Sequence, residues 1–181
     1  MIKLAIIGTG SHANKHFEAF NAIDGVKIVA ICDVNEENLR QFGDTHGVAT
    51  TYRSADDLFA NEDFDAISNV TPDRFHKHIG LQALAAGKHV FSEKPLAENY
   101  ADARELVLAA KQSGLINMVN FSYLNASGYQ GMAEIVKSGE LGRINQVVAS
   151  YNQCWLTSDY WGLFKEDPRF LWRLSEAHGS Q

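Results

Sequence analysis

The sequence predicts an α/β protein in which a doubly wound parallel sheet precedes the start of an α+β domain with an antiparallel sheet. Three observations support the first part. Apolar runs alternate with helix-like stretches along the first 121 residues, the first run leads directly into a glycine-rich turn, and later runs end in polar residues. Such alternation is typical of parallel sheets covered by helices. We place the domain boundary so that the second domain spans 122–181.

Composition narrows the classes of protein to which the chain can belong. It has 181 residues, 45% hydrophobic residues and a net charge of −6, which disfavours non-specific binding to nucleic acid. No apolar run approaches the about 20 residues of a membrane span, and the first residues lack a secretory pattern. Cys32 and Cys154 form no spaced motif, so we expect free or buried thiols. These features predict a soluble cytoplasmic protein.

The first apolar run, residues 4–7, leads into the pattern Gly-x-Gly-x-x-Ala formed by Gly8, Gly10 and Ala13. Gly8 permits a tight turn, Gly10 lets backbone N–H groups approach a pyrophosphate, and Ala13 lets the next helix pack close to the strand. The N-terminus of that helix adds unpaired N–H donors and a partial positive charge. We therefore predict a dinucleotide phosphate site. The other turn residues that we expect there are Thr9, Ser11 and His12.

The second apolar run, residues 26–32, ends in Asp33, which follows Gly10 by 23 residues. Dinucleotide-binding folds place an acidic residue about 20 residues after the turn, where it accepts hydrogen bonds from the adenosine ribose. A carboxylate there repels a 2′-phosphate, so Asp33 favours NAD over NADP. Two alternatives stay open. Asp33 or Asn35 caps the helix predicted over 35–44, or the turn belongs to an α/β fold that binds no dinucleotide.

A helix is predicted over 11–20, and it carries His12 and His16 four residues apart. This spacing places two side chains on one helix face, as in some metal sites. However, no Glu stands where a zincin motif would need it, and His12 falls where the phosphate is expected. We therefore predict no metal site.

The run 65–70 leads into Thr71-Pro72, which we interpret as the start of a helix over 72–86. The carboxyl ends of parallel strands border the ligand crevice of an open sheet. Thr71 and Pro72 are therefore candidates for contact with a cofactor. His76, one turn into the helix, either reaches the cofactor or is a surface or capping residue.

The run 88–92 ends in Glu93-Lys94-Pro95, which places a cation beside an acid at the same edge of the sheet. This position favours a functional role for Lys94 over that of an ordinary surface lysine. A helix over 99–111 and a last strand over 115–119 complete the first domain.

The pattern changes after residue 122. A helix is predicted over 127–138, and an extended run over 143–155 has apolar residues on one face, as expected for an antiparallel strand. Large aromatic residues then gather between Trp155 and Trp172. Because one strand cannot form a sheet, we expect this domain to be incomplete or to be completed by another chain.

Together, the glycine turn, Asp33, the segment 71–76 and the segment 93–95 resemble the glucose–fructose oxidoreductase / inositol dehydrogenase (Gfo/Idh/MocA) family. The resemblance covers essentially the whole chain. It implies an NAD(P)-binding Rossmann domain over 1–121, with NAD the expected cofactor, and a partial substrate and oligomerisation domain over 122–181.

The resemblance also implies a function. Members of the family oxidise a secondary hydroxyl of a sugar, inositol or related polyol, and Lys94 matches their catalytic lysine, which would assist hydride transfer to the nicotinamide. Glu93, Thr71 and Pro72 would line the nicotinamide and its ribose. Lys94 and Tyr123 would lie near the substrate. A homo-oligomer is expected for the full-length form.

Two departures from the family pattern change what is expected of this chain. Leu124 stands near the domain crossing where many members have an Arg, and the chain ends before the segment that holds the family's Asp and His for proton transfer. His178 does not match that segment. We therefore expect a truncated chain with weak or no activity. The alternatives are a non-catalytic NAD-binding or oligomeric interaction module and a sugar-sensing regulator.

Overall fold

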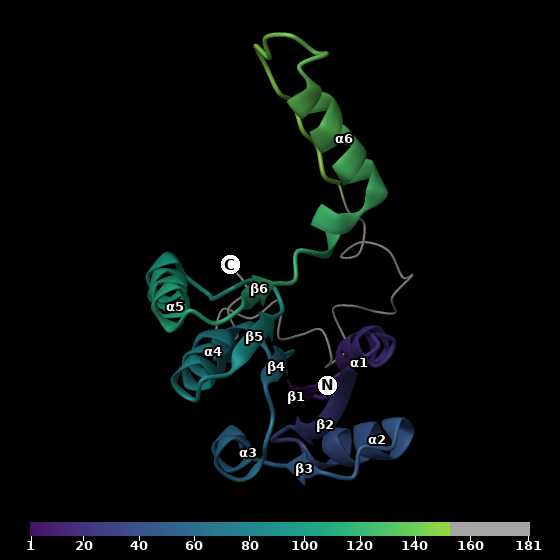
Figure 1. The fold of residues 1–181 in the computed structure, drawn as a ribbon, viewed down its shortest axis with the longest axis vertical. Helices are drawn as coiled ribbons and strands as arrows, with labels where there is room; N and C mark the ends of the chain where they lie inside the picture. Colours follow the sequence, from purple (N-terminus) through teal and green to yellow (C-terminus); the bar gives the residue numbers. More distant parts are fainter. Residues whose placement is uncertain (153–181) are drawn as a thin grey trace. The chain divides into compact units, whose positions relative to one another are not determined.

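The computed structural model describes residues 1–152, and the chain divides into two units, Met1–Asn120 and Phe121–Gln181. In the first unit, helices lie on both sides of one sheet (Figure 1). None of the helices in the described part of the chain is long and apolar enough to cross a membrane.

The first unit is built on a six-stranded parallel sheet with strand order β3-β2-β1-β4-β5-β6, which confirms the predicted doubly wound α/β fold. The chain order reverses between β1 and β4, and such a switch point is where doubly wound sheets bind ligands. The strands are β1 (Ile2–Ile7), β2 (Val26–Cys32), β3 (Thr51–Tyr52), β4 (Ala66–Asn69), β5 (His89–Ser92) and β6 (Asn117–Val119).

The sequence pattern does not reveal β3. Its two residues, Thr51 and Tyr52, pair with Ile31 and Cys32 of β2. A strand this short has no periodicity of its own, so only its neighbour in the folded sheet defines it.

Helices cover both faces of the sheet (Figure 1). One face carries α1 (Ala13–Asn21) and α2 (Glu36–His46), and the other carries α3 (Ala55–Asn61), α4 (His76–Ala85) and α5 (Tyr100–Ser113). Successive residues of β1 point into the two resulting cores: Ile6 packs in the cluster with Ala13 of α1, whereas Ile7 packs in the cluster with Leu58 of α3. Because both faces are covered, the strand is apolar throughout rather than alternating.

The helix starts show which predicted caps are used. Asn35 caps α2, since its side chain accepts a hydrogen bond from the Asn38 N–H at 3.0 Å. Asp33, two residues before this cap, accepts the Asn35 N–H at 2.8 Å. Ser54 caps α3, because its hydroxyl accepts a hydrogen bond from the Asp57 N–H at 3.5 Å.

The helix predicted over 72–86 begins later than expected. Pro72 is extended (φ −60°, ψ 150°), a 3-10 turn follows over Asp73–Phe75, and the α-helix starts at His76. The Thr71 hydroxyl donates to the Asn69 side chain at 2.7 Å. Thr71 therefore points toward β4 instead of capping a helix that starts at Pro72.

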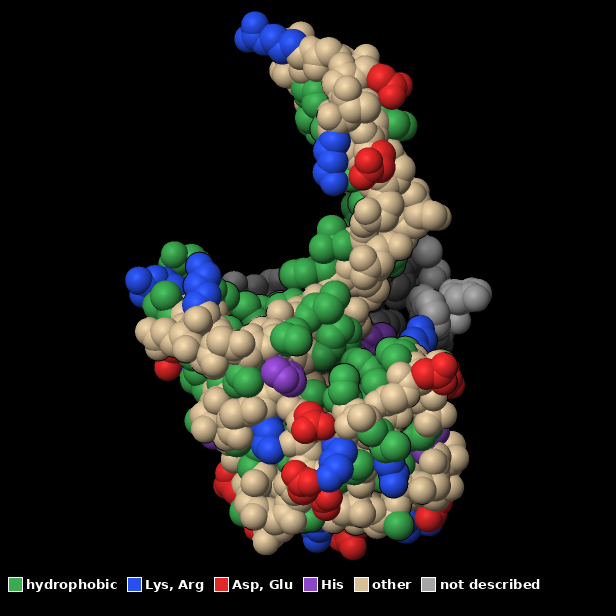
Figure 2. Space-filling view, in the orientation of Figure 1, with side chains coloured by type: hydrophobic (Ala, Val, Ile, Leu, Met, Phe, Trp, Pro, Cys, Tyr) green, Lys and Arg blue, Asp and Glu red, His purple; other side chains and the backbone are tan. Residues whose placement is uncertain are grey.

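Charged side chains on the surface of the first unit are mixed in sign. On the face drawn in Figure 2, acidic and basic side chains are interspersed across this unit. Many form pairs of opposite charge, as Arg40 does with Glu37 and Asp44 along α2. Exposed pairs of this kind contribute little to stability. Because the charges are mixed, neither positive nor negative charge dominates the face drawn in Figure 2.

The described part of the second unit contains a 3-10 turn (Ser122–Asn125) and α6 (Ser127–Ser138), the helix that the sequence predicts. The strand predicted over 143–155 is wrong for its described part, because residues 143–152 form no strand. A strand needs a neighbour for its backbone hydrogen bonds, and residues 121–152 contain no other strand. The rest of that run and the aromatic-rich segment 155–172 lie outside the described residues.

Candidate functional site

Four strand ends meet at the switch point of the sheet. Ile7, the last residue of β1, pairs with Cys32 of β2 and with Asn69 of β4, and Asn69 pairs with Ser92 of β5. The four strands therefore end at one level, and the loops that follow them share one edge of the sheet. The first residues of these loops are Gly8, Asp33, Val70 and Glu93.

The glycine turn after β1 combines close packing on one side with open space on the other. Gly8 has φ +93°, and a Cβ on it would lie 2.6 Å from the Val70 carbonyl oxygen, so only glycine fits there. A Cβ on Gly10 would instead meet nothing within 4 Å. Ser11 and His12 are exposed beside it. The turn thus presents accessible backbone at the start of α1, which fits a phosphate group.

Asp33 is held in place by the glycine turn. Its Oδ2 accepts hydrogen bonds from the Thr9 N–H at 2.7 Å and from the Thr9 hydroxyl at 2.9 Å, and its Oδ1 accepts the Asn35 N–H at 2.8 Å. Thr9 is buried, so it serves to orient the carboxylate. Asp33 is therefore both a helix-start residue and a fixed acceptor, and its Oδ1 keeps about one lone-pair position for a ribose hydroxyl.

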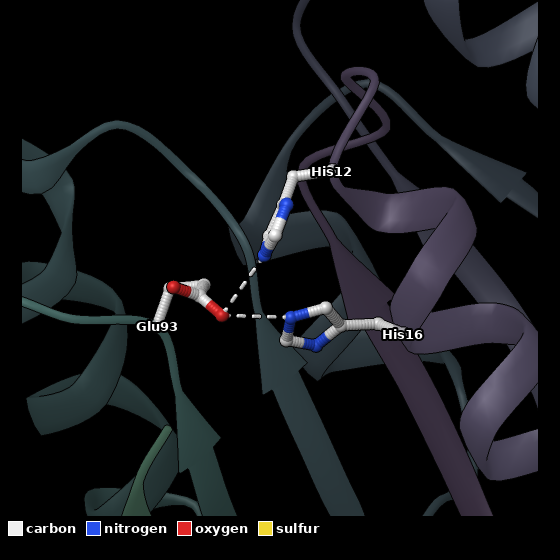
Figure 3. Close-up of side chains that lie close together, drawn as sticks. All are labelled: His12, His16 and Glu93. Atoms are coloured by element: carbon white, nitrogen blue, oxygen red, sulfur yellow. Dashed lines mark hydrogen bonds and ion pairs between the residues drawn. The ribbon is translucent and has the colours of Figure 1, made fainter. Parts of the chain in front are cut away.

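Three side chains lie close together beside the glycine turn, those of His12, His16 and Glu93 (Figure 3). The Glu93 Oε1 lies 3.0 Å from His16 Nε2 and 3.3 Å from His12 Nε2. His16 and Glu93 are buried, whereas the side chain of His12 is about half exposed. The other ring nitrogen of His16, Nδ1, lies 2.8 Å from the Ser68 hydroxyl of β4. The Asn120 amide donates to the same Glu93 oxygen at 2.6 Å.

This environment keeps Glu93 ionised. Burial alone would raise its pKa, but hydrogen bonds from His16 and Asn120, together with the charge of His12, outweigh burial and lower the pKa to about 2. For His12 the net effect is opposite in kind: burial, together with the nearby His16 and Lys15, lowers its pKa although Glu93 raises it. At neutral pH the site therefore holds a carboxylate beside a neutral imidazole.

Glu93 should make the first unit sensitive to acid. Its pKa in the folded chain, about 2, is below the ordinary value of 4.5, so its contribution to stability is present above pH 4.5 and is lost as the pH falls toward 2. We expect Glu93→Gln to be less stable than the wild type at pH 7 by a few kcal/mol. The free energy of unfolding of the variant should also change less between pH 4.5 and 2, as measured by urea unfolding. If the free energy of unfolding changed with pH by the same amount in both proteins, this account would be contradicted.

Lys94 is exposed at the end of β5. Its backbone N–H donates to the Glu93 Oε2 at 3.2 Å. Within residues 1–152, the Lys94 ammonium has no hydrogen-bond or ion-pair partner. The cation is thus available to a ligand, next to a carboxylate that stays charged.

His76 lies inside the protein and joins two of the loops. Its Nδ1 is 2.6 Å from the Pro95 carbonyl oxygen and its Nε2 is 2.8 Å from the Thr71 carbonyl oxygen. The ring is 1% exposed, so its polar atoms are occupied by the chain itself. These two contacts hold the loop that carries Thr71 close to the loop that carries Lys94. Pro72, which follows Thr71, is exposed.

Sequence reasoning missed three polar residues that support the site, Ser68, Asn69 and Asn120, and it noted His16 without its contacts. Ser68 and Asn69 are buried at the end of β4, where Ser68 contacts His16 of α1 and Asn69 accepts the Thr71 hydroxyl. Polar residues within an apolar run, such as Ser68 and Asn69, were a usable signal, since buried polar groups need partners. Tyr123, the other predicted substrate residue, lies in the second unit, where it is exposed and packs near Tyr129.

Comparisons with known proteins identify the family to which the chain belongs. Residues 2–121 match the profile of the GFO_IDH_MocA family, described as an oxidoreductase family with an NAD-binding Rossmann fold. D-apiose dehydrogenase of Paraburkholderia graminis is 32% identical over 140 residues, which cover 77% of this chain and 37% of that protein.

Solved structures give the same result. WlbA dehydrogenase from Bordetella pertussis, in complex with NADH and UDP-GlcNAcA, superposes with a TM-score of 0.76 at 28% identity, over 79% of this chain and 44% of the other. Scyllo-inositol dehydrogenase from Lactobacillus casei, with bound NAD(H) and scyllo-inositol, has a TM-score of 0.75 at 29% identity, over 80% and 43%. The chain spans less than half the length of these relatives. Since the family profile covers well over half of its residues, the chain belongs to the Gfo/Idh/MocA family of oxidoreductases with an NAD-binding Rossmann fold.

Proposed function

We propose that this chain binds NAD in the crevice at the switch point and is the cofactor-binding part of a dehydrogenase that acts on a secondary hydroxyl of a sugar, inositol or related polyol. The observation that carries the proposal is the Asp33 carboxylate, which Thr9 holds beside an open glycine turn. Two of the dehydrogenases to which the chain is similar act, by their names, on D-apiose and myo-inositol.

The residues of the crevice fit the parts of the cofactor. The accessible backbone at Gly10 and Ser11, with the side chain of His12, suits the diphosphate. Asp33 suits the hydroxyls of the adenosine ribose. Thr71, Pro72 and Glu93 would line the nicotinamide end. When bound, NAD⁺ supplies the hydride acceptor.

Lys94 is the residue that we propose for catalysis. Its ammonium is exposed and has no partner in the described part of the chain. A cation placed at the reacting hydroxyl stabilises the negative charge that develops on oxygen as the hydride leaves carbon. Glu93 and His76 act differently: Glu93 accepts the Lys94 backbone N–H, and His76 holds the Thr71 and Pro95 loops together. We therefore propose positioning roles for these two residues.

Cofactor affinity tests the proposal directly. We expect the 181-residue chain to bind NAD⁺ more tightly than NADP⁺ in a calorimetric titration. Asp33→Ala should weaken NAD⁺ binding by about tenfold or more, because hydrogen bonds to a charged group are worth about 1.5–3 kcal/mol. Asp24→Ala, which removes an exposed acid from the loop before β2, is the control. If neither dinucleotide binds, the proposal fails.

The same titration also measures the selectivity for NAD⁺ over NADP⁺, which should depend on Arg53. The Tyr52 carbonyl accepts the Asp33 N–H at 3.1 Å, so Arg53 follows at the same edge of the sheet. Its guanidinium pairs with Glu36 at 3.1 Å in an exposed ion pair. Once the Asp33 charge is removed, no carboxylate at that position repels a 2′-phosphate, and the positive charge of Arg53 attracts it. The ratio of NAD⁺ to NADP⁺ affinity should therefore fall in Asp33→Ala. An unchanged ratio would reduce Asp33 to a structural residue.

We also propose that the second unit mediates association between copies of the chain. None of the residues of α6 is buried, and its apolar side chains recur at helical spacing. The exposed members are Tyr129, Met132, Ile135 and Val136. We expect sedimentation velocity to detect a species larger than the monomer, and Met132→Ser with Ile135→Ser to shift it toward the monomer. A monomer at all concentrations would contradict this interaction role.

A further inference from the structure

The His12, His16 and Glu93 cluster has a property that the proposed cofactor site does not require. Its three potential ligand atoms, Nε2, Nε2 and a carboxylate oxygen, all lie within 4.8 Å of one another. They come from two distant segments, the start of α1 and the end of β5, and they meet only in the folded sheet (Figure 3). We propose that these residues form a binding site for a divalent transition-metal ion, with Zn²⁺ as the best-matched ion.

The spacing of the donor atoms suits zinc. Zinc binds histidine nitrogen and carboxylate oxygen at about 2.0–2.2 Å in tetrahedral geometry, so neighbouring ligand atoms lie about 3.3 Å apart. The Glu93 Oε1 lies 3.3 Å from His12 Nε2 and 3.0 Å from His16 Nε2. Two of the three edges are therefore already near the required length. A set of two imidazoles and one carboxylate favours zinc over magnesium or calcium, which prefer oxygen ligands.

The hydrogen bonds around Glu93 leave a place for a cation. Its Oε1 is approached by three nitrogen groups, those of His12, His16 and Asn120, at 3.3, 3.0 and 2.6 Å. A carboxylate oxygen has about two lone-pair positions, so three N–H donors cannot all be well accommodated. A metal ion would replace the two imidazole N–H donors by one shared cation, while the Asn120 amide continues to orient the carboxylate.

The surroundings also set the protonation states that a metal requires. The Ser68 hydroxyl, 2.8 Å from His16 Nδ1, can accept an N–H from that nitrogen, which leaves the Nε2 lone pair for the ion. His16 and Glu93 are buried but His12 is half exposed, so a fourth coordination position would open toward solvent on the His12 side.

The expectation of no metal depended on the absence of a local Glu and on the phosphate site predicted at His12. His12 and His16 have the i, i+4 spacing of a helical metal pair, but their own helix lacks a suitable Glu. The fold supplies the missing acid from Glu93, which lies 77 residues after His16. A ligand contributed from the end of another strand cannot be recognised as part of a local motif.

The test is a calorimetric titration of the 181-residue chain with Zn²⁺ alone. We expect saturable binding of one ion, and we expect His12→Ala to weaken it by more than tenfold, because the variant loses a direct ligand. Glu93→Gln should weaken it similarly. The matched control is His78→Ala, which removes an exposed histidine of α4 and should bind as the wild type does. Urea unfolding of each variant verifies that it is folded.

The outcomes are distinct. Absence of saturable Zn²⁺ binding, or equal affinity in His12→Ala and the wild type, overturns the metal site. The site shares His12 and Glu93 with the proposed cofactor crevice but does not depend on it, because the titration contains no dinucleotide. A chain that binds NAD⁺ and not Zn²⁺ therefore refutes only the metal site, and one that binds Zn²⁺ and neither dinucleotide refutes only the proposed function.

Discussion

Lys94→Met is expected to lower polyol-dependent reduction of NAD⁺ by at least about a hundredfold, measured in a protein that joins this chain to the remaining length of its relatives. Removing one preorganised group that stabilises developing charge costs enzymes about that factor or more. Lys94 suits this role because its ammonium has no partner in residues 1–152 and stands beside an ionised carboxylate. The affinity for NAD⁺ should change little, since the turn and Asp33 stay intact.

The measurement compares initial rates of NADH formation with a panel of sugars and inositols, alongside calorimetric NAD⁺ affinity. Lys27→Met is a suitable control because Lys27 is exposed near the start of β2, at the opposite edge of the sheet. Equal turnover in Lys94→Met and the wild type would remove Lys94 from the mechanism. Equal loss of turnover and of NAD⁺ affinity would make it a binding residue only.

Gly8→Ala is expected to destabilise the first unit by about 2–5 kcal/mol and to abolish NAD⁺ binding. A left-handed backbone conformation costs a non-glycine residue about 1–2 kcal/mol, and overpacking adds about 1–3 kcal/mol. Both costs apply at Gly8, where φ is +93° and a Cβ would lie 2.6 Å from the Val70 carbonyl oxygen. The obstacle is backbone of the neighbouring strand end, so no side-chain rotation relieves it.

Gly25→Ala separates the two costs. Gly25 also has a positive φ, +84°, but a Cβ there would meet nothing within 4 Å. We expect this variant to lose only about 1–2 kcal/mol in urea unfolding and to keep its NAD⁺ affinity. Equal destabilisation by the two substitutions would show that backbone conformation, and not the approach of the Val70 strand end, makes Gly8 necessary.

The parts of the fold that could be predicted are those in which local pattern and global structure agree. The apolar run before Gly8 is buried on both faces by helices, and the spacing to Asp33 follows from one strand–helix–strand unit. The helix over 127–138 was also recognisable, because its residues and its terminal glycine are local signals. In each of these cases the interactions that define the structure join residues close in sequence or lie within one strand–helix–strand unit.

The parts that could not be predicted depend on contacts between distant segments. β3 exists because its two residues pair with β2, and the expected strand over 143–155 is absent from residues 143–152, where no neighbouring strand is available. In the site, the pairing of His16 with Glu93 joins α1 to the end of β5. His76 was recognised near the crevice, but only the folded loops show that both of its nitrogens face carbonyl oxygens.

The level ends of β1, β2, β4 and β5 have a thermodynamic consequence. No single segment of the first unit holds enough of the crevice to bind a ligand, because the groups that line it come from Gly8 through Asn120. A molecule that occupies the crevice therefore binds the native state and not the unfolded chain, so occupancy and folding are linked equilibria. Any molecule that binds at this edge of the sheet should stabilise the whole sheet. Its binding should be detectable as a rise in melting temperature even without catalysis.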